Sequence, residues 1–185
     1  MEQDSRVRES LVSQIENAYG KVVYTFTCHN KQAHIYSWLE DILSWSDIIL
    51  TAITAGGLLA LLFSNEKALA IISACCAALS LMINLYQKDA KLAQRAEQHR
   101  AFAQLLWLPR EKYISLLTDA PALTTEVIQA RRDQLSNEVN IIYSNQPITG
   151  GLAYKQAQRA IKRNGEQFFE RQELNNMLPE QLIRQ

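Results

Sequence analysis

Residue types that could perform chemistry are few in this sequence, and their spacing forms no catalytic pattern. The candidate metal ligands are Cys28, His29, His34 and His99. Their spacing matches no standard zinc pattern, which favours ordinary helix-surface residues instead. The sequence contains no P-loop or dinucleotide fingerprint, and no nucleophile with a neighbouring base. We therefore predict that the protein is not an enzyme and uses no metal or cofactor. The alternative, an enzyme, would depend on Asp47 alone, as a catalytic carboxylate embedded in the membrane.

A group of cations between residues 155 and 163 is a sharper candidate for a site. At 3.6 residues per turn, four of them fall within about 100° of one another, opposite the apolar residues of the same predicted helix. Cations in this arrangement suit phosphate oxygens, so they predict a site for an anionic ligand. A solvated helix face and attraction to anionic lipid are the alternatives. With two earlier arginines, the candidate set is Arg131, Arg132, Lys155, Arg159, Lys162 and Arg163.

Two charge-free stretches in the middle of the chain set the class of the protein. Residues 48–65 and 68–87 contain no charged side chain, and each is long enough, at about 20 residues, to cross a bilayer core about 30 Å thick. A backbone in lipid must bond to itself, so both stretches should be helices. Trp38, Trp45 and Tyr86 flank them, where interfacial aromatics belong. The sequence predicts a tight transmembrane hairpin; the alternative is a buried helical hairpin at the centre of a soluble bundle.

Polar residues recur on one face of each predicted span and could line a narrow pore once several copies assemble. The candidate pore-lining set is Asp47, Thr51, Thr54, Ser73, Ala77, Ser80 and Asn84. Serine and threonine can also bond their own helix carbonyls, which is the alternative role. Small residues, most of them four apart, would let helices approach closely, either inside the hairpin or between copies. This helix-packing set is Ala52, Gly56, Gly57, Ala60, Ala70, Ala74 and Ala78.

The placement of lysine and arginine predicts the orientation in the membrane. Within about 20 residues of the spans, four cations follow the second span, Lys31 alone precedes the first, and Lys67 alone lies in the turn. Both termini are therefore expected in the cytoplasm. Residues 1–47 hold four Lys/Arg and seven Asp/Glu, whereas residues 88–185 hold fourteen and eleven. This split favours packing of the two soluble arms against each other, or an anionic partner for the second arm.

The rest of the sequence predicts helices only, so the fold class is all-α. We divide the chain into an N-terminal cytosolic helical arm (1–47), the transmembrane hairpin (48–87) and a C-terminal cytosolic helical bundle (88–185). In the first arm, Gly20 predicts a break or bend. The second span is expected to continue as one helix into the cytoplasm until Pro109 interrupts it. Its predicted seam consists of Leu92, Ala96, His99, Ala103 and Leu106.

Two further helices are expected beyond Pro109. Asp119-Ala-Pro121 should end one segment, and Thr124 or Thr125 should begin a helix with Leu135, Val139 and Ile142 on its apolar face. Residues 145–151 read as a loop because they contain a proline and a pair of glycines. A last long helix is expected over about 152–173. Its packing residues would be Ala153, Ala157, Ala160, Ile161 and Phe168.

Three segments carry a family resemblance: KVVYTFTCHNKQAHIYSWLEDI (21–42), the short turn SNEK (64–67) and YQKDAKLAQRAEQHRAF (86–102). In this layout the chain resembles the SLATT family, bacterial two-transmembrane effectors encoded beside nucleotide-signal enzymes in anti-phage conflict systems. Within that family, the basic C-terminal arm best suits the Hailong type of system, which pairs a compact SLATT protein with an oligonucleotide-making nucleotidyltransferase.

The resemblance implies an oligomeric, ion-conducting pore in the bacterial inner membrane, gated by a nucleotide or oligonucleotide from a partner nucleotidyltransferase. Depolarisation with growth arrest or cell death would be the outcome. No fused nucleotide-sensing domain is recognisable in these 185 residues, so a signal would bind the helical arms or a separate subunit. The alternative function is a non-conducting membrane scaffold or sensor that recruits a partner through its cytosolic helices.

Overall fold

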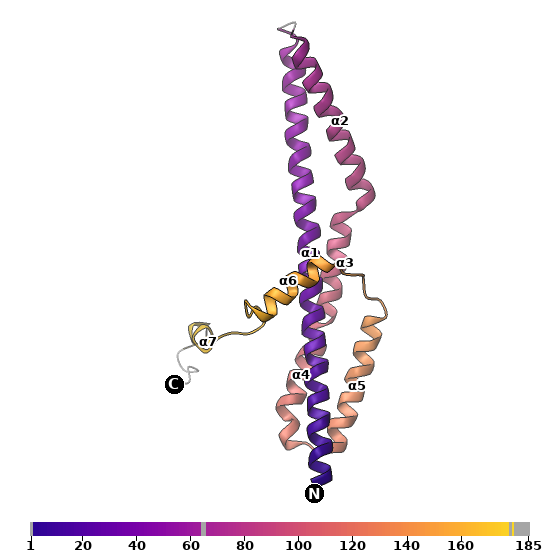
Figure 1. The fold of residues 1–185 in the computed structure, drawn as a ribbon, viewed down its shortest axis with the longest axis vertical. Coiled ribbons are helices and arrows are strands. Elements are labelled where there is room, and N and C mark those ends of the chain that lie inside the picture. Colours follow the sequence, from indigo (N-terminus) through magenta and orange to yellow (C-terminus); the bar gives the residue numbers. More distant parts are fainter. Residues whose placement is uncertain (1, 64–65, 178, 180–185) are drawn as a thin grey trace. The chain divides into compact units, whose positions relative to one another are not determined.

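The computed structural model describes residues 2–63, 66–177 and 179, and these contain helices and no strands (Figure 1). This confirms the predicted all-α class. The elements are α1 (Glu2–Ala60), α2 (Lys67–Ala90), α3 (Leu92–Leu105), α4 (Trp107–Asp119), the 3-10 helix η1 (Ala120–Ala122), α5 (Thr125–Tyr143), α6 (Gly151–Lys162) and α7 (Arg171–Met177). The chain divides into two compact units, one of residues 1–32 with 99–185 and one of residues 33–98. We call them the arm unit and the hairpin unit and describe each by itself.

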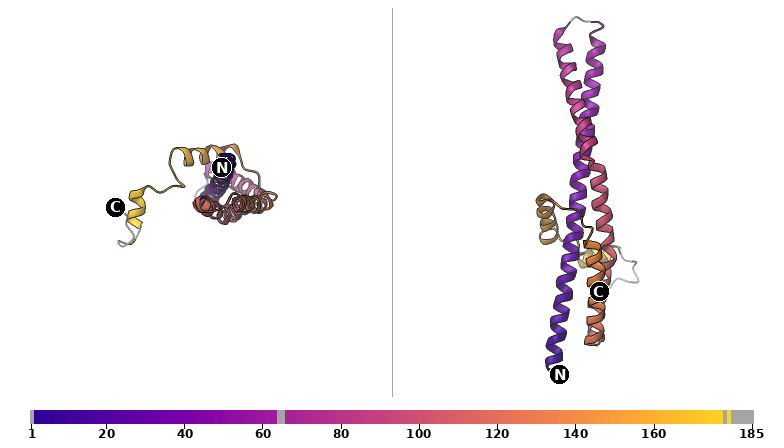
Figure 2. Two further views of the ribbon diagram at one scale, coloured as in Figure 1. Left: turned by 90° about the horizontal axis from the view of Figure 1, so that it is seen from below. Right: turned by 90° about the vertical axis from the view of Figure 1, so that its right-hand side faces the viewer.

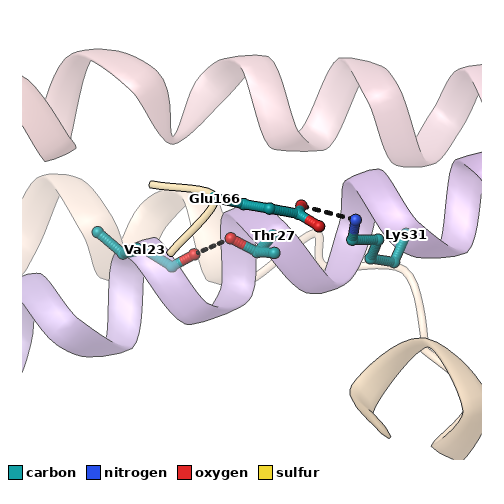
Figure 3. A network of polar contacts seen from close by, with 4 residues as sticks. All are labelled: Val23, Thr27, Lys31 and Glu166. Carbon is teal, nitrogen blue, oxygen red and sulfur yellow. Dashed lines mark hydrogen bonds and ion pairs between the residues drawn. The ribbon is translucent and has the colours of Figure 1, made fainter. Parts of the chain in front are cut away.

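Helix α1 passes through Gly20 without interruption, so the break expected there is wrong. A glycine inside a helix costs about 1 kcal/mol relative to alanine, which burial of neighbouring residues can offset. Ile15 and Val22, on either side of Gly20, are completely or almost completely buried. The β-branched run after Gly20 is helical as well. Thr27 donates its hydroxyl to the carbonyl of Val23 at 2.9 Å (Figure 3), so this buried polar side chain is satisfied within its own helix.

The core of the arm unit is formed by apolar residues of α1, α3, α4 and α5, together with Leu106 between α3 and α4 and Ala120 of η1. Figures 1 and 2 show the first part of α1 alongside α4 and α5. As predicted, Leu135 and Val139 of α5 are buried, and Ile142 is partly buried against them. The buried cluster is Leu11, Ile15, Val22, Phe102, Leu106, Tyr113, Leu116, Ala120, Ile128, Leu135 and Val139.

The breaks expected around the prolines are confirmed. Helix α3 ends at Leu105, and Pro109 lies in the first turn of α4, where a missing backbone N–H leaves no intrahelical bond unmade. Helix α4 ends at Asp119, and α5 begins at Thr125 with Thr124 in the extended N-cap conformation.

The second apolar helix does not run unbroken to Pro109, as we had expected. Helix α2 ends at Ala90 because Lys91 adopts the left-handed conformation, with φ 49° and ψ 46°, and α3 begins at Leu92. Lys91 still donates its N–H to Gln87 at 3.1 Å and accepts from Arg95 at 3.0 Å. The break therefore strains the backbone at one residue, and few backbone hydrogen bonds are lost. All five predicted seam residues, 92, 96, 99, 103 and 106, follow this break, and all are buried.

The last long helix is also shorter than expected, because α6 ends at Lys162. Gly165 has a φ of +62°, and the N–H of Glu166 turns back to the carbonyl of Ala160 at 3.2 Å. Glycine adopts this left-handed conformation at little cost, so it ends the helix. Phe168 consequently does not pack on the apolar face of α6 and is 62% exposed.

In the hairpin unit, α1 and α2 run antiparallel, side by side (Figures 1 and 2). Side chains along the contact are partly or fully buried at alternating spacings of three and four residues, which is the spacing of a coiled-coil seam. The seam consists of Leu43, Asp47, Leu50, Thr54 and Gly57 on α1 with Leu61 just after it, and Leu69, Ser73, Cys76, Ser80, Ile83 and Gln87 on α2. The turn residues Ser64 and Asn65 lie outside the described residues.

The outer surfaces of both hairpin helices are apolar and uncovered. The most apolar 18-residue window of α1 has no buried residue, and that of α2 has 6% of its residues buried. The interfacial aromatics are exposed too, with Trp45 at 65%. A hairpin at the centre of a soluble bundle would have these side chains covered, so that alternative does not describe this fold. Both helices are long and apolar enough to cross a membrane.

Candidate functional site

The hairpin seam contains a hydrogen-bonded cluster around Asp47. The carboxylate oxygen Oδ1 of Asp47 accepts from the hydroxyl of Ser80 and from Asn84 Nδ2, the latter at 2.8 Å. Thr51 Oγ1 lies 3.3 Å from Ser80 Oγ and adds a second hydroxyl from α1. Four side chains from two helices therefore share one network, near the start of the first charge-free stretch and the end of the second.

Further polar contacts extend this network along the hairpin in both directions. Gln87 Nε2 donates to Ser44 Oγ at 3.0 Å, and Thr54 Oγ1 lies 2.8 Å from the carbonyl of Leu50 and 3.4 Å from that of Ser73. We call the whole set the polar ladder: Ser44, Asp47, Thr51, Thr54, Ser73, Ser80, Asn84 and Gln87. In lipid, polar side chains without partners are costly, so these contacts offset a large desolvation cost for every member except Ser73, whose hydroxyl has no partner.

The polar ladder contains six of the seven residues that we predicted to line a pore. Only Ala77 stands outside it, and Ala77 is exposed. The sequence alone indicates one polar face on each helix and does not predict that the two face each other. In the structure they meet within one chain. Thr51 and Asn84 remain exposed at the flank of the ladder, so one edge of it is open. Pore lining by this edge stays a prediction.

The predicted helix-packing residues divide into one close contact and an outer group. Gly57 lies in the seam, where an added Cβ would stand 2.1 Å from Ser73 Oγ. Ser73 is 1% exposed and its hydroxyl has no hydrogen-bond partner. At the neighbouring Gly56 an added Cβ would meet nothing within 4 Å. Ala60 is partly covered, and the outer group is Ala52, Gly56, Ala70, Ala74 and Ala78, all exposed. Packing of this outer group between copies stays a prediction.

The cationic residues of α6 and of its C-cap, Arg163, lie together, as the helical spacing predicted. They line a hollow of about 460 Å³ with Gln158, and the structure shows no ion pair to them from any described residue. The opposite face of α6 is buried through Ala153, Ala157 and Ala160. We call the four cations, Lys155, Arg159, Lys162 and Arg163, the basic stripe. A surface with four uncompensated positive charges can hold a phosphate-rich anion.

The two arginines of α5 do not line the same hollow. Arg131 lies 3.6 Å from the carboxylate of Asp119, and Arg132 contacts Asp133 at 2.8 Å and the side-chain oxygen of Gln14. Each of them lines a different hollow from the one beside the basic stripe. The basic stripe is therefore the part of the predicted anion site that the structure brings together.

Two of the candidate metal ligands form a buried pair in the arm unit. His29 Nδ1 and His99 Nδ1 are 2.8 Å apart, and Gln146 lies 3.2 Å from His29 Nε2. With Gln146 donating, His29 carries its proton on Nδ1 and donates it to His99. Burial, together with the neighbouring His99, lowers the pKa of His29 to about 4, and burial also lowers the pKa of His99. His34 is exposed, and no described residues form a metal-binding group of three or more.

The family model of the SMODS and SLOG-associating 2TM effector domain family 4 matches residues 11–173. The chain belongs to this SLATT family. Comparison with curated proteins and with solved structures found no match. Membership confirms the predicted family, and it makes the protein a membrane effector of anti-phage conflict systems. The name of the family also associates the protein with SMODS and SLOG partner systems, which are of the nucleotidyltransferase type.

Sequence reasoning missed several residues that organise the sites of this SLATT protein. Ser44 and Gln87 continue the three-and-four spacing of the polar ladder, so that spacing could have identified them. The pairing of His29 with His99 had no such signal, because 70 residues separate the two. The contacts that fasten α6 to α1 are equally distant in sequence.

Proposed function

We propose that this SLATT protein oligomerises in the bacterial inner membrane, with both termini in the cytoplasm, and forms an ion-conducting pore. Conduction would depolarise the infected cell and cause growth arrest or death. The polar ladder is the observation that carries this proposal. A carboxylate and seven hydroxyl or amide groups recur along two helices whose outer faces are apolar. A purely structural anchor has no need of polar groups at that depth.

An oligomer follows from the geometry of a hairpin, because two helices cannot enclose a water-filled path. Assembly would place the open edge of the polar ladder, at Thr51 and Asn84, toward a shared axis, and the outer small residues would allow close packing between copies. Asp47 in the ladder would concentrate cations near the pore. This arrangement favours cation conduction.

The basic stripe supports gating by a nucleotide or oligonucleotide from a partner nucleotidyltransferase. Four exposed cations on one helix face would each contact phosphate oxygens, and such binding weakens as salt rises. Association of the family with nucleotidyltransferase-type partner systems agrees with this ligand class. A Hailong-type pairing is the arrangement we favour.

Ion flux through liposomes that contain the purified protein tests the proposal directly. We expect a homo-oligomer in detergent and cation flux in liposomes. Reporters fused at either terminus should read cytoplasmic, and a reporter inserted at Asn65, outside the described residues, should read external. A protein that oligomerises in the membrane yet never conducts would contradict the pore and favour the scaffold.

The scaffold alternative rests on apolar side chains exposed in the arm unit. Leu105, Trp107 and Leu108 at the end of α3 and the start of α4 are each more than half exposed, as is Ile141 of α5. Exposed apolar side chains of this size are typical of surfaces that bind another protein. A scaffold would lose partner binding, with no effect on membrane potential, when Trp107 and Leu108 are replaced by serine.

A further inference from the structure

Helix α6 is fastened to α1 at both of its ends. Before α6, the N–H of Gly150 donates to Gln32 Oε1 at 2.8 Å, and Gln32 is buried. After α6, the Glu166 carboxylate forms an ion pair with Lys31 Nζ at 2.7 Å, and Figure 3 shows the Glu166 side chain extending along α1 toward Lys31. The two anchoring residues on α1 are adjacent in sequence. The segments at both ends of one short helix are therefore held by two adjacent residues of α1.

Additional contacts from the same segment fall on the same short stretch of α1. The rings of Tyr154 and Tyr24 are 5.2 Å apart, and Gln146 in the preceding loop contacts His29. Every one of these contacts falls within residues 24–32 of α1. We call residues 146–166 the strap.

The strap is held by contacts that a ligand could overcome. The Lys31 and Glu166 side chains are 27% and 37% exposed, and ion pairs at such exposure contribute little to stability. The buried face of α6 presents three alanines, whose small side chains remove little apolar surface from water. A conformational equilibrium responds to a ligand only when the free-energy difference between its two states is small, and a partly exposed ion pair and an alanine face favour such a small difference.

The basic stripe and the anchoring acid are neighbours in the strap. Arg163 is three residues from Glu166, and hydrogen bonding to Lys31 lowers the pKa of Glu166, so its carboxylate is charged at neutral pH. An anion held at the end of the stripe would repel this carboxylate. Ligand binding and docking of Glu166 on Lys31 therefore oppose each other.

We propose that the strap is a regulatory contact that an anion on the basic stripe releases from residues 24–32 of α1. The ligand is the phosphate-rich anion of the proposed function, on which this inference rests. Helix α1 carries both the docking stretch and the ladder residues Asp47, Thr51 and Thr54, and it is continuous between them. Release of the strap thus acts on the helix that forms one side of the polar ladder.

Peptide-resolved hydrogen exchange of residues 151–162 tests the strap in the full-length protein in liposomes. Lys31→Glu and Glu166→Lys should each raise exchange about fivefold, because each turns an attraction into a repulsion. The double reversal should restore wild-type exchange. Lys112→Glu breaks another ion pair of the arm unit, Lys112 with Glu138, and should leave residues 151–162 unchanged. If hydrogen exchange of residues 151–162 is the same in both single variants as in the wild type, the proposed docking of the strap is wrong.

The same liposomes test the link to the ligand and to the membrane. Inorganic tripolyphosphate should raise exchange of residues 151–162 in the wild type, and not after glutamine replaces all four cations of the basic stripe. Ion flux should change in the single reversals and return in the double reversal. If tripolyphosphate leaves exchange unchanged, or if flux ignores the reversals, the proposal is wrong. A wild type that never conducts refutes the pore instead, and the exchange pattern then decides whether the strap exists.

Discussion

The two buried histidines tie the stability of the arm unit to pH. A single proton on Nδ1 of His29 satisfies the contact with His99, whereas protonation of His99 at Nδ1 would set two N–H groups against each other. The pKa of His29 is lowered to about 4 from 6.5, so the unfolded chain takes up a proton at a higher pH than the folded chain does. Stability contributed by the neutral pair is therefore complete above pH 6.5 and is lost as pH falls toward 4.

We expect the Tm of the protein in detergent to fall between pH 6.5 and pH 4.5, corresponding to a loss of up to about 3 kcal/mol from His29. His29→Gln should lower Tm at neutral pH and flatten this dependence, because the titrating ring is gone. Thermal unfolding followed by circular dichroism measures both effects. His34→Gln is the matched control, since His34 is exposed and should leave the slope unchanged. An unchanged slope in His29→Gln would contradict the assignment.

Asp47 gives a second prediction at the level of one residue. Its carboxylate accepts hydrogen bonds from Ser80 and Asn84 and is the one charge inside the polar ladder. Asp47→Asn removes this charge at nearly constant size, so the reversal potential in an ion gradient should shift toward anions. Asp41→Asn neutralises an exposed acid of the same helix and should have a much smaller effect. Equal shifts in the two variants would show that Asp47 has no special position.

At the scale of elements, the hairpin depends on which of two adjacent glycines faces α2. Gly57→Leu would place a branched side chain against Ser73 in the seam, so we expect separation of the helices and loss of the polar ladder. Gly57→Ala should be mild, because the Ser73 hydroxyl can rotate and the next atom, Ser73 Cβ, is 3.5 Å away. Intramolecular disulfide formation between cysteines placed at Ser44 and Gln87 reports the hairpin contact.

Gly56→Leu completes this experiment as the matched variant. Gly56 meets nothing within the chain, so the hairpin crosslink should form as in the wild type. If Gly56 packs between copies, this variant should instead dissociate the oligomer in detergent. If Gly57→Leu dissociates the oligomer and Gly56→Leu does not, the outer small residues do not form the contact between copies.

The elements also show what sequence patterns can predict. Charge-free length identified both apolar helices, and Pro109, Pro121 and the Gly150–Gly151 pair marked breaks, because proline and glycine act through local backbone geometry. Tertiary packing overrode the local signal at Gly20, whose neighbours are buried. The break at Lys91 had no signal at all, since lysine rarely adopts a positive φ. Which faces of α1 and α2 meet was equally hidden, because both contain small and polar residues.

At the scale of the whole molecule, the described part of the hairpin consists of two helices whose outer surface is apolar almost throughout. Two helices cannot enclose a water-filled path, so the conduction that we propose would be a property of an assembly. The polar ladder gives the hairpin two possible uses for the same groups. Inside the seam, these polar groups form hydrogen bonds with one another. At the open edge of the ladder, they are available to contact water. Thr51 and Asn84 lie at that edge, so we expect their replacement to separate the proposed conduction from folding.

Replacing Thr51 and Asn84 with leucine should therefore reduce ion flux while leaving the oligomer intact. Leucine at the edge would make any shared path apolar, and narrow apolar constrictions close by dewetting. Asp47 and Ser80 would keep their mutual hydrogen bond, so the hairpin should still form. Flux in liposomes and mass in detergent are measured on the same preparation. Ile49→Leu, an exchange of one exposed apolar residue of α1 for another, is the control and should conduct normally. Full flux in the double variant would exclude the open edge from the conducting path, whereas loss of the oligomer would show that these two residues pack between copies.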